Sequence, residues 1–232
     1  MTLINLKDLS FAQLDELAAS MGQPKFRAKQ MRDWLYAKNE TDIAAMSNLP
    51  KDFRERLAAT HTAAGLAAAA TRTAPDGTVK YLFALDDGLT VETVYIPEEK
   101  RKTVCVSTQV GCKFQCAFCA TGTMGFSRNL RPSEILNQVI EARRNAGEVT
   151  NVVFMGMGEP LDNFSAVTRA LEALHSPEGF NIGARRITIS TVGLPEQIEQ
   201  LGKTGLKTNL AISLHAASDA VRTRLMPVDR KS

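Results

Sequence analysis

Three cysteines in one short loop are the residues of this chain whose types and spacing best define a chemistry. Cys112, Cys116 and Cys119 follow a C-x3-C-x2-C spacing. Three thiolates from one loop can bind three irons of a [4Fe-4S] cube and leave the fourth iron open. An open iron can take the amino and carboxylate groups of S-adenosylmethionine (SAM) and pass it an electron. The spacing therefore predicts a [4Fe-4S] cluster and SAM as cofactors.

The other interpretations of this loop are a zinc or redox site and a set of inert buried thiols. A structural zinc site needs four ligands, commonly from two cysteine pairs far apart in sequence, and no second pair follows here. Buried thiols are common as small hydrophobes. Because three cysteines rarely lie this close together by chance, we favour the cluster.

Composition limits the class of protein. The chain has 232 residues, 44% of them hydrophobic, which fits one large domain or a domain with a smaller one. All four cysteines lie between positions 105 and 119, unlike the spread-out cysteines of a secreted disulfide framework. The first residues do not resemble a signal peptide, and the Ala-rich stretch 63–70 is too short to span a bilayer. We expect a cytoplasmic, reducing location and no membrane partner.

Charge gives little information about partners. The formal net charge is only +3, which does not by itself identify a nucleic-acid-binding protein. A helix expected over 25–38 does carry Lys25, Arg27, Lys29 and Arg32. These cations form either a solvated helix surface or a set of phosphate contacts.

Periodicity divides the chain into three parts. Apolar spacing predicts helices over 11–21, 25–38 and 51–57, which gives a small helical domain over 1–62. Turn residues separate strands expected over 69–73, 79–85 and 89–96, and a linker is expected over 97–102, so 63–102 is a β-hairpin extension. From 103 to 232 strands alternate with helices, which indicates a parallel sheet wrapped by helices. The strands are expected over 104–108, 151–155, 186–190 and 209–214, and the helices over 134–146 (capped by Ser133), 164–174, 195–201 and from 218.

Polar or glycine-rich residues follow each of these parallel strands. Working groups in βα folds lie at the carboxyl ends of the strands, so four such ends beside the cysteine loop predict one site. Gly156 and Gly158 allow a backbone to approach a ligand, or simply form a turn. Glu159 either accepts hydrogen bonds from the ammonium group of SAM or is a surface carboxylate.

The last two strand ends carry hydroxyls and a histidine. Ser190 and Ser213 either bind ribose or carboxylate oxygens or satisfy nearby backbone groups. His215, which follows Leu214, is more often a packed histidine than a ligand.

Two further residues can be interpreted either as ordinary structural residues or as chemically active ones. Cys105 lies in the first parallel strand, seven positions before the cysteine loop. It is either a small buried hydrophobe or a thiol near the cluster that acts as a base or nucleophile. Glu92, on a strand of the extension, is on residue type alone part of a solvated face.

Taken together, the motifs resemble the radical SAM adenosine C2 methyltransferases of 23S rRNA and tRNA (the RlmN type). The resemblance covers the whole chain and is carried by 26–36 (FRAKQMRDWLY), 91–97 (VETVYIP), 111–122 (GCKFQCAFCATG), 154–160 (FMGMGEP), 189–193 (ISTVG), 214–215 (LH) and 225–227 (LMP). The cysteine spacing alone would indicate only the radical SAM superfamily. The resemblance implies a partial (β/α) barrel and an electron donor such as flavodoxin.

The resemblance also implies roles for individual residues. Cys112, Cys116 and Cys119 ligate the cluster. Glu92 is the proton acceptor, and Cys105 resolves a covalent protein–RNA intermediate and can pair with a second cysteine in a disulfide. The SAM site comprises Gly158, Glu159, Ser190, Ser213, Leu214 and His215.

The implied mechanism explains the need for radical chemistry. Adenine C2 is electron-poor and cannot attack the SAM methyl group. In the family one SAM methylates a cysteine, a second SAM is cleaved reductively, and the resulting methylcysteine radical adds to C2. This chain has no cysteine after Cys119, so we expect the methyl-carrying cysteine, an Asn of the SAM site and the last barrel units to lie beyond Ser232. The 232 residues alone are then expected not to methylate C2.

Two alternatives remain at this point. One is the C8-methylating resistance relative, which shares the cluster and both cysteines. The other is a non-catalytic Fe–S RNA-binding module, which the missing cysteine allows. A SAM pocket at Glu159 and Ser190 would favour an enzyme, because RNA binding alone does not need one.

Overall fold

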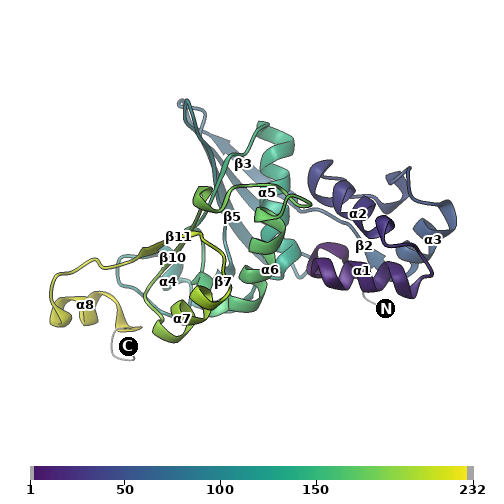
Figure 1. The fold of residues 1–232 in the computed structure, drawn as a ribbon. Coiled ribbons are helices and arrows are strands. Elements are labelled where there is room, and N and C mark those ends of the chain that lie inside the picture. Colours follow the sequence, from purple (N-terminus) through teal and green to yellow (C-terminus); the bar gives the residue numbers. More distant parts are fainter. Residues whose placement is uncertain (1–2, 229–232) are drawn as a thin grey trace.

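A seven-stranded mixed sheet forms the centre of the computed structural model, which describes residues 3–228 (Figure 1). The strand order is β11-β10-β9-β6-β5-β4-β3. Four strands are parallel: β6 (Lys102–Cys105), β9 (Asn151–Phe154), β10 (Ile187–Thr191) and β11 (Asn209–Ile212). Three are antiparallel: β3 (Ala67–Thr73), β4 (Val79–Ala84) and β5 (Thr90–Pro97). The predicted α/β class is confirmed.

Helices bury one face of this sheet. α5 (Pro132–Ala146) follows β6, and α6 (Phe164–His175) follows β9 and packs beside α5. The strand residues that face them are apolar and buried, because alternate positions of a strand point to the same face. These residues are Val104, Val152, Phe154, Ile187 and Ile189. The shorter helices α7 (Pro195–Lys203) and α8 (Asp219–Leu225) lie towards the β10–β11 side in Figure 1.

The opposite face of the sheet, here called the open face, carries half-buried and exposed side chains. Strand pairing places one residue from each strand in a single row across it. The row consists of Arg72, Lys80, Val94, Cys105, Val153, Thr188 and Asn209, none of them fully buried. The open face therefore runs without a break from the extension to the parallel strands.

The segment expected as a linker is a hairpin turn instead. β5 continues through Pro97, β6 begins at Lys102, and the Glu98 N–H donates to the Arg101 carbonyl (2.7 Å). The strand pairing between Val94 and Cys105 extends the sheet across position 102. Turn propensity identified the polar residues here, but it could not show that the flanking strands pair. A domain boundary at this point stays a prediction.

The first 62 residues contain the expected helices. They comprise β1 (Ile4–Asn5), η1 (Leu6–Asp8), α1 (Phe11–Ser20), α2 (Phe26–Arg32), η2 (Asp33–Ala37, a π-helical turn that continues α2), η3 (Ile43–Ala45), α3 (Lys51–Thr60) and β2 (His61–Thr62). The Ser10 hydroxyl caps α1 by accepting from the Gln13 N–H, and the Gln13 side-chain oxygen accepts from the Ser10 N–H. This reciprocal pair is a capping box.

Arg32 does not belong to a solvated basic face. Its side chain is buried and forms ion pairs with Asp15 (2.6 Å) and Glu178 (2.6 Å). Arg32 thereby ties α2 to α1 and to the segment after α6. Lys25 and Lys29 remain exposed.

Two short strands around the cysteine loop were not expected from the sequence. β7 (Gln109–Gly111) and β8 (Phe126–Asn129) pair with each other, and α4 (Ala120–Thr123) lies between them. The remaining short elements are η4 (Pro160–Asn163) and η5 (Ala184–Arg186).

The cap of α5 also differs from the prediction. The helix begins at Pro132, and the Ser133 N–H donates to Asp8 (2.8 Å) instead of Ser133 acting as the cap. Proline suits the first helical position because its missing N–H would have no helical partner there.

Among the helices of residues 3–228, none is both long enough and apolar enough to cross a bilayer.

Candidate active site at the cysteine loop

The backbone of the cysteine loop is closed by a tight contact at its base. Gly111 has φ +76°, and a Cβ there would lie 1.9 Å from the Gly125 carbonyl oxygen, so only glycine fits. The Cys112 N–H donates to the same carbonyl (2.8 Å), and the Cys119 N–H donates to the Cys116 carbonyl (3.0 Å). These contacts fix the positions of the three cysteine backbones.

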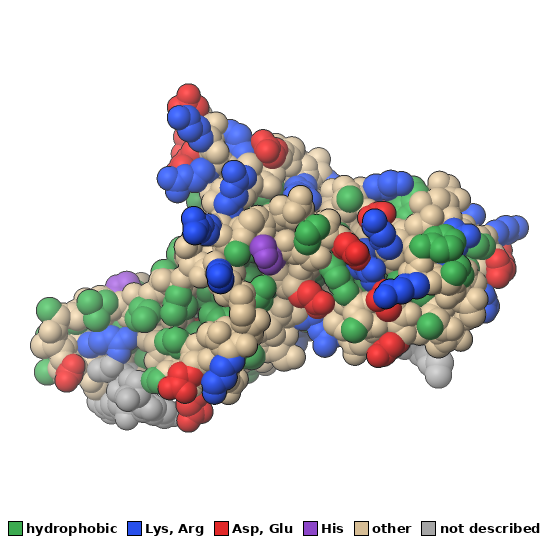
Figure 2. Space-filling model, in the orientation of Figure 1, with side chains coloured by type: hydrophobic (Ala, Val, Ile, Leu, Met, Phe, Trp, Pro, Cys, Tyr) green, Lys and Arg blue, Asp and Glu red, His purple; other side chains and the backbone are tan. Residues whose placement is uncertain are grey.

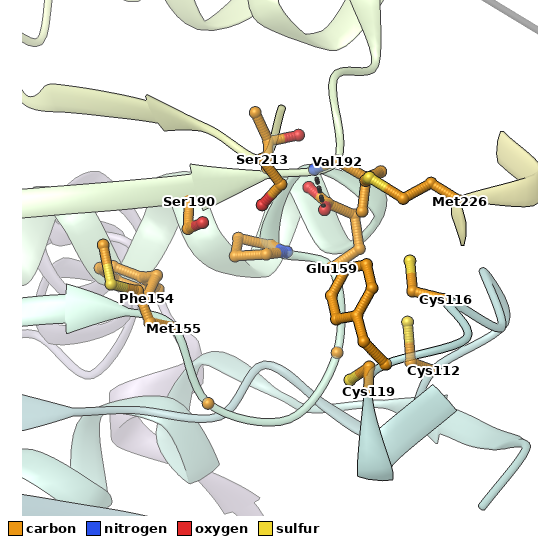
Figure 3. A pocket seen from close by; sticks show the side chains of 15 residues that line it. Cys112, Cys116, Cys119, Phe154, Met155, Glu159, Ser190, Val192, Ser213 and Met226 are labelled. Atoms are coloured by element: carbon orange, nitrogen blue, oxygen red, sulfur yellow. Dashed lines mark hydrogen bonds between the residues drawn. The ribbon is translucent and has the colours of Figure 1, made fainter. Parts of the chain in front are cut away.

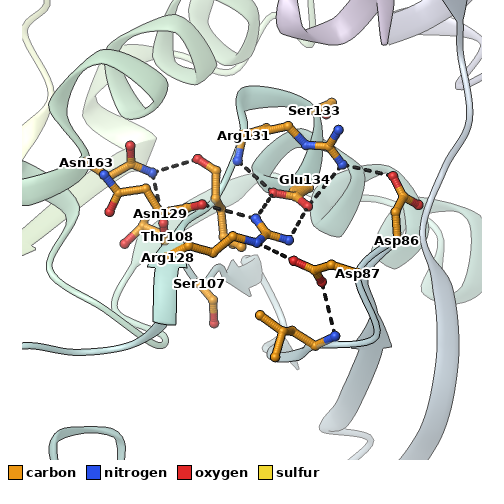
Figure 4. Close-up of polar contacts among 12 residues, drawn as sticks. Asp86, Asp87, Ser107, Thr108, Arg128, Asn129, Arg131, Ser133, Glu134 and Asn163 are labelled. Carbon is orange, nitrogen blue, oxygen red and sulfur yellow. Dashed lines mark hydrogen bonds and ion pairs between the residues drawn. The ribbon is translucent and has the colours of Figure 1, made fainter. Parts of the chain in front are cut away.

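An ionic network around the buried carboxylate of Glu134 anchors the loop to α5 (Figure 4). Arg128 of β8 donates to both carboxylate oxygens of Glu134 (2.8 and 2.9 Å) and to Asp87 in the β4–β5 turn (2.5 Å). Glu134 also accepts from the Arg131 N–H (2.7 Å). Burial alone would raise the pKa of Glu134, but the Arg128 and Arg131 hydrogen bonds outweigh it and lower that pKa.

A second set of contacts joins the loop to η4. The Gln109 amide donates to Asn129 (2.8 Å) and to Asp162 (2.8 Å). Lys113, next to the first loop cysteine, forms an ion pair with Asp162 (2.5 Å). Gln109 and Asp162 were not singled out from the sequence, because nothing in their local motifs shows that they meet.

The three loop cysteines line one pocket, as predicted (Figure 3). All of them are free thiols, and burial raises the pKa of Cys112 and Cys116. Metal binding would stabilise the thiolates, because ligation requires the deprotonated form.

The thiols are not arranged around a single ion. Within residues 3–228, no three His, Cys, Asp or Glu side chains are close enough together to hold one metal ion. Thiolates that bind three different irons of a cube need not converge on one point, as zinc ligands must. Cys112, Cys116 and Cys119, three thiols that line one pocket, fit the three-thiolate ligation of a [4Fe-4S] cluster that keeps one iron open.

Two hydroxyls predicted from the strand ends line the same pocket. Ser190 is the last residue of β10 whose side chain lies on the open face, and Ser213 directly follows β11. Among the described residues neither hydroxyl is engaged in a hydrogen bond, which leaves both available to a ligand. The expected convergence of strand ends is thus observed for these residues.

Glu159 also lines the pocket, but it has a structural task. Its carboxylate accepts from the backbone N–H of Leu161 (3.0 Å) and of Val192 (2.8 Å), and the residue is 3% exposed. Burial raises its pKa, although the two backbone hydrogen bonds act in the opposite direction. Because each carboxylate oxygen has two lone pairs, Glu159 can still accept from a ligand.

The two glycines before Glu159 are required by the protein's own packing. A Cβ on Gly156 would lie 2.7 Å from Ser107 Oγ, and a Cβ on Gly158 (φ +96°) would lie 2.5 Å from Gln109 Cβ. Gly158 also lines the pocket. The close approach that these residues permit is therefore to β7 and the segment before it.

Leu214 and His215 lie at the rim and not among the pocket-lining residues. Leu214 is 64% exposed. The His215 ring contacts the Phe118 ring of the cysteine loop, with centroids 4.3 Å apart. Phe118 lines the pocket, so His215 touches the site only through it.

Cys105 and Glu92 lie on the open face beside this pocket. Val94 of β5 pairs with Cys105. Glu92 lies two residues before Val94 on the same face, so Glu92 and Cys105 are diagonal neighbours whose Cα atoms are about 7–8 Å apart. Burial raises the pKa of Cys105, and a backbone hydrogen bond with Met155, itself a pocket residue, opposes this effect. Glu92 is not simply solvated, because Lys80 Nζ lies 2.6 Å from its carboxylate.

No disulfide links any cysteines of residues 3–228, since all four are free. The disulfide expected for Cys105 is thus not found.

The pocket includes buried residues that were not assigned to it from the sequence, Met226 among them. Met226 is fully buried, lines the pocket and packs against Cys116. Its segment is held by Arg222, which donates to the Val192 (2.8 Å) and Ser213 (3.1 Å) carbonyls. The only signal for Met226 was its place in the 225–227 motif.

Comparisons with known proteins agree with this geometry. The Radical SAM superfamily matches residues 106–231, and the ribosomal RNA large subunit methyltransferase N-terminal domain matches residues 4–62. The dual-specificity RNA methyltransferases RlmN of Geotalea uraniireducens and Geobacter sulfurreducens are each 46% identical to this chain, over 98% and 99% of it. The chain spans 66% and 63% of their lengths, just under two thirds.

A solved structure is similar over the same range. The crystal structure of a radical SAM methyltransferase from Sphaerobacter thermophilus matches with a TM-score of 0.91 and 44% identity. The match covers 98% of this chain and 68% of that one. With three thiols in one pocket at the strand ends and both family domains matched, the chain belongs to the radical SAM superfamily and, within it, to the RlmN-type proteins.

Proposed function

We propose that this chain acts in a radical SAM RNA methyltransferase that methylates C2 of adenosine in 23S rRNA and tRNA. The relatives named above are dual-specificity RNA methyltransferases. The observation that carries the proposal is a fourth thiol, Cys105, on the open face beside a pocket lined by three others. A protein that only bound RNA would need neither the hydroxyl-lined pocket nor this additional thiol.

Different pocket residues bind the cluster and SAM. Cys112, Cys116 and Cys119 hold the [4Fe-4S] cluster, which when bound supplies the electron for reductive cleavage of SAM. Ser190 and Ser213 bind polar groups of SAM. The Glu159 carboxylate accepts from its ammonium group.

Residues of the open face act on the RNA base. Adenine C2 cannot act as a nucleophile, so the base becomes covalently attached to the protein during methyl transfer. Glu92 accepts the proton that leaves C2. Cys105 releases the product by bonding to the sulfur of the methyl-carrying cysteine, which breaks the bond between that sulfur and the carbon attached to C2. Residues 120–232 offer no candidate for that cysteine.

The proposal includes a cellular setting. Cluster thiolates and a free Cys105 require a reducing compartment, so we place the protein in the cytoplasm. A small electron-transfer protein such as flavodoxin would deliver the electron.

The test is nucleoside mass spectrometry of RNA from a host that lacks its own adenine C2 methyltransferase. Expression of a gene that supplies this chain together with a methyl-carrying cysteine should produce 2-methyladenosine, and Cys105→Ala should abolish it while keeping the iron content. Formation of 8-methyladenosine would instead support the resistance relative. Absence of both products, together with no SAM cleavage by the purified protein, would support the binding module.

A further inference from the structure

The row of residues across the open face has a cationic end. Arg72 of β3 and Lys80 of β4 are direct pairing partners, and Lys80 is followed along the row by Val94 and Cys105. Their side chains line a hollow together with Ala70, Leu82 and Glu92. We propose that Arg72 and Lys80 form a phosphate-binding site for the RNA segment whose adenosine lies at Cys105. This inference rests on the proposed function and adds the location of a substrate contact.

The spacing along the row suits a polynucleotide. Neighbouring strands lie about 4.8 Å apart, so the Lys80 backbone is roughly 10 Å from that of Cys105 and the Arg72 backbone roughly 14 Å. Long, flexible side chains extend this reach. A base seated at Cys105 therefore brings its own phosphate, or that of a neighbouring nucleotide, over the cationic end of the row.

The charges in the hollow indicate which cation is free. Lys80 is already paired with Glu92, and both side chains are about half exposed (48% and 44%). Arg72 is exposed and forms no ion pair with any residue of 3–228. Its planar guanidinium can bind a phosphate through two parallel hydrogen bonds.

Glu92 determines where in the hollow the phosphate lies. A carboxylate repels a phosphate, so the phosphate occupies the Arg72 side, and Lys80 lies between the two anions. Ala70 and Leu82 form the rest of the lining and offer no side-chain acceptor.

A competing explanation is that Arg72 protects an edge strand. β3 is the last strand of the sheet and all seven of its residues are exposed, and charged side chains on such edges hinder unwanted strand pairing. Lys, Arg, Asp and Glu side chains also gather on the projection formed by the β3–β4 hairpin and the turn after β5 (Figure 2). An edge-protecting arginine would not affect RNA affinity, so binding measurements separate the two explanations.

The experiment measures binding of the reconstituted chain to a fluorescently labelled, unmodified tRNA transcript over a range of salt concentrations. Arg72→Gln should weaken binding about tenfold or more, as expected when a charge-assisted contact to one phosphate is removed. It should reduce the slope of log K against log salt by about 0.7. The matched control is Lys100→Gln, which removes an exposed cation of the β5–β6 turn and should change neither value. An unchanged melting temperature shows that Arg72→Gln is folded.

Ethylation of single RNA phosphates then locates the contact. Neutralising a phosphate next to the target adenosine should weaken binding to the unmodified chain but not to Arg72→Gln, because the partner is already missing. If Arg72→Gln behaves like Lys100→Gln, the phosphate site is wrong and the proposed function stands. If the unmodified chain shows no salt-dependent RNA binding, the proposed function fails as well.

Discussion

The pocket at the cysteine loop and the open face adjoin each other, but they are built differently. Pocket residues are fixed by buried hydrogen bonds, as when Glu159 accepts from Leu161 and Val192. The open face carries half-exposed side chains whose main polar contact is the Lys80–Glu92 ion pair. A small cofactor is best held by groups already in position, whereas an RNA backbone can be met by side chains that adjust. Under the proposed function, the SAM end of the site would be preformed and the RNA end would adapt on binding.

The iron content of cysteine variants tests the pocket most directly. After anaerobic reconstitution, Cys112→Ala, Cys116→Ala and Cys119→Ala should each lose most of the bound iron, because each removes one ligand of the cluster. Cys105→Ala is the control and should retain it, since Cys105 lies outside the pocket lining. Iron analysis and absorbance spectra measure the outcome. Equal loss in the Cys105 variant would mean a four-cysteine site and would remove the distinction between pocket and open face.

The ion pair between Arg128 and Glu134, which anchors the cysteine loop to α5, should contribute strongly to the free energy of unfolding. Arg128→Met leaves the buried Glu134 without its main partner and should lower the free energy of unfolding by about 3 kcal/mol. The matched control is Arg101→Met, whose ion pair with Glu98 is exposed (3.8 Å) and should be worth less than about 1 kcal/mol. Denaturant titration compares them; similar losses would show that burial does not strengthen the anchor.

The stabilisation that this ion pair provides should depend on pH. The folded-state pKa of Glu134 lies below its ordinary value, so its contribution is present above the unfolded pKa and is lost as pH falls through the lowered folded value. The stability difference between the unmodified chain and Arg128→Met should therefore shrink in acid. A difference that stays constant down to strongly acidic pH would exclude Glu134 as its source.

Substitutions within the pocket should separate ligand contacts from structural ones. Ser190→Ala should weaken SAM binding without a change in stability, because the hydroxyl has no partner among the described residues. Glu159→Ala should weaken SAM binding roughly tenfold and also destabilise the fold, since it leaves two buried N–H groups without acceptors. Calorimetric titration of SAM and thermal melting give the two readouts. Unchanged SAM affinity in Glu159→Ala would restrict this residue to its structural task.

The smallest effect is expected at the N-terminal helix. Replacing Lys25 and Lys29 with Gln should reduce the salt slope of RNA binding by about 0.7–0.9 for each phosphate that these lysines bind. Arg32→Gln should instead destabilise the fold, because Arg32 is buried between two carboxylates. An unchanged salt slope in the lysine variant would assign this helix surface to solvent.

The sequence predicted those features that depend on local pattern. Apolar periodicity located the main helices and strands, and the spacing of the three cysteines located the pocket. The convergence of Ser190, Ser213 and Glu159 followed from a general property of parallel sheets.

What the sequence could not predict depends on partners distant in the chain. The burial of Arg32 requires Glu178, and the pairing of Glu92 requires a register that sets Lys80 beside it. The β7–β8 pair could not be predicted from local pattern, because its two short strands lie on opposite sides of the cysteine loop. The position of His215 at the rim depends on its contact with the Phe118 ring.

The continuity of the sheet across position 102 has a consequence for the order of folding. β3 to β6 form a meander of successive hairpins, whereas β6 reaches its other neighbour, β9, only after the long excursion through the cysteine loop and α5. Contacts between residues close in sequence form sooner than those that close large loops. The extension therefore provides a template edge at β6 on which the parallel strands assemble. Pulse-labelled hydrogen exchange should show β4 and β5 amides protected before those of β10, and the reverse order would mean that the parallel strands nucleate on their own.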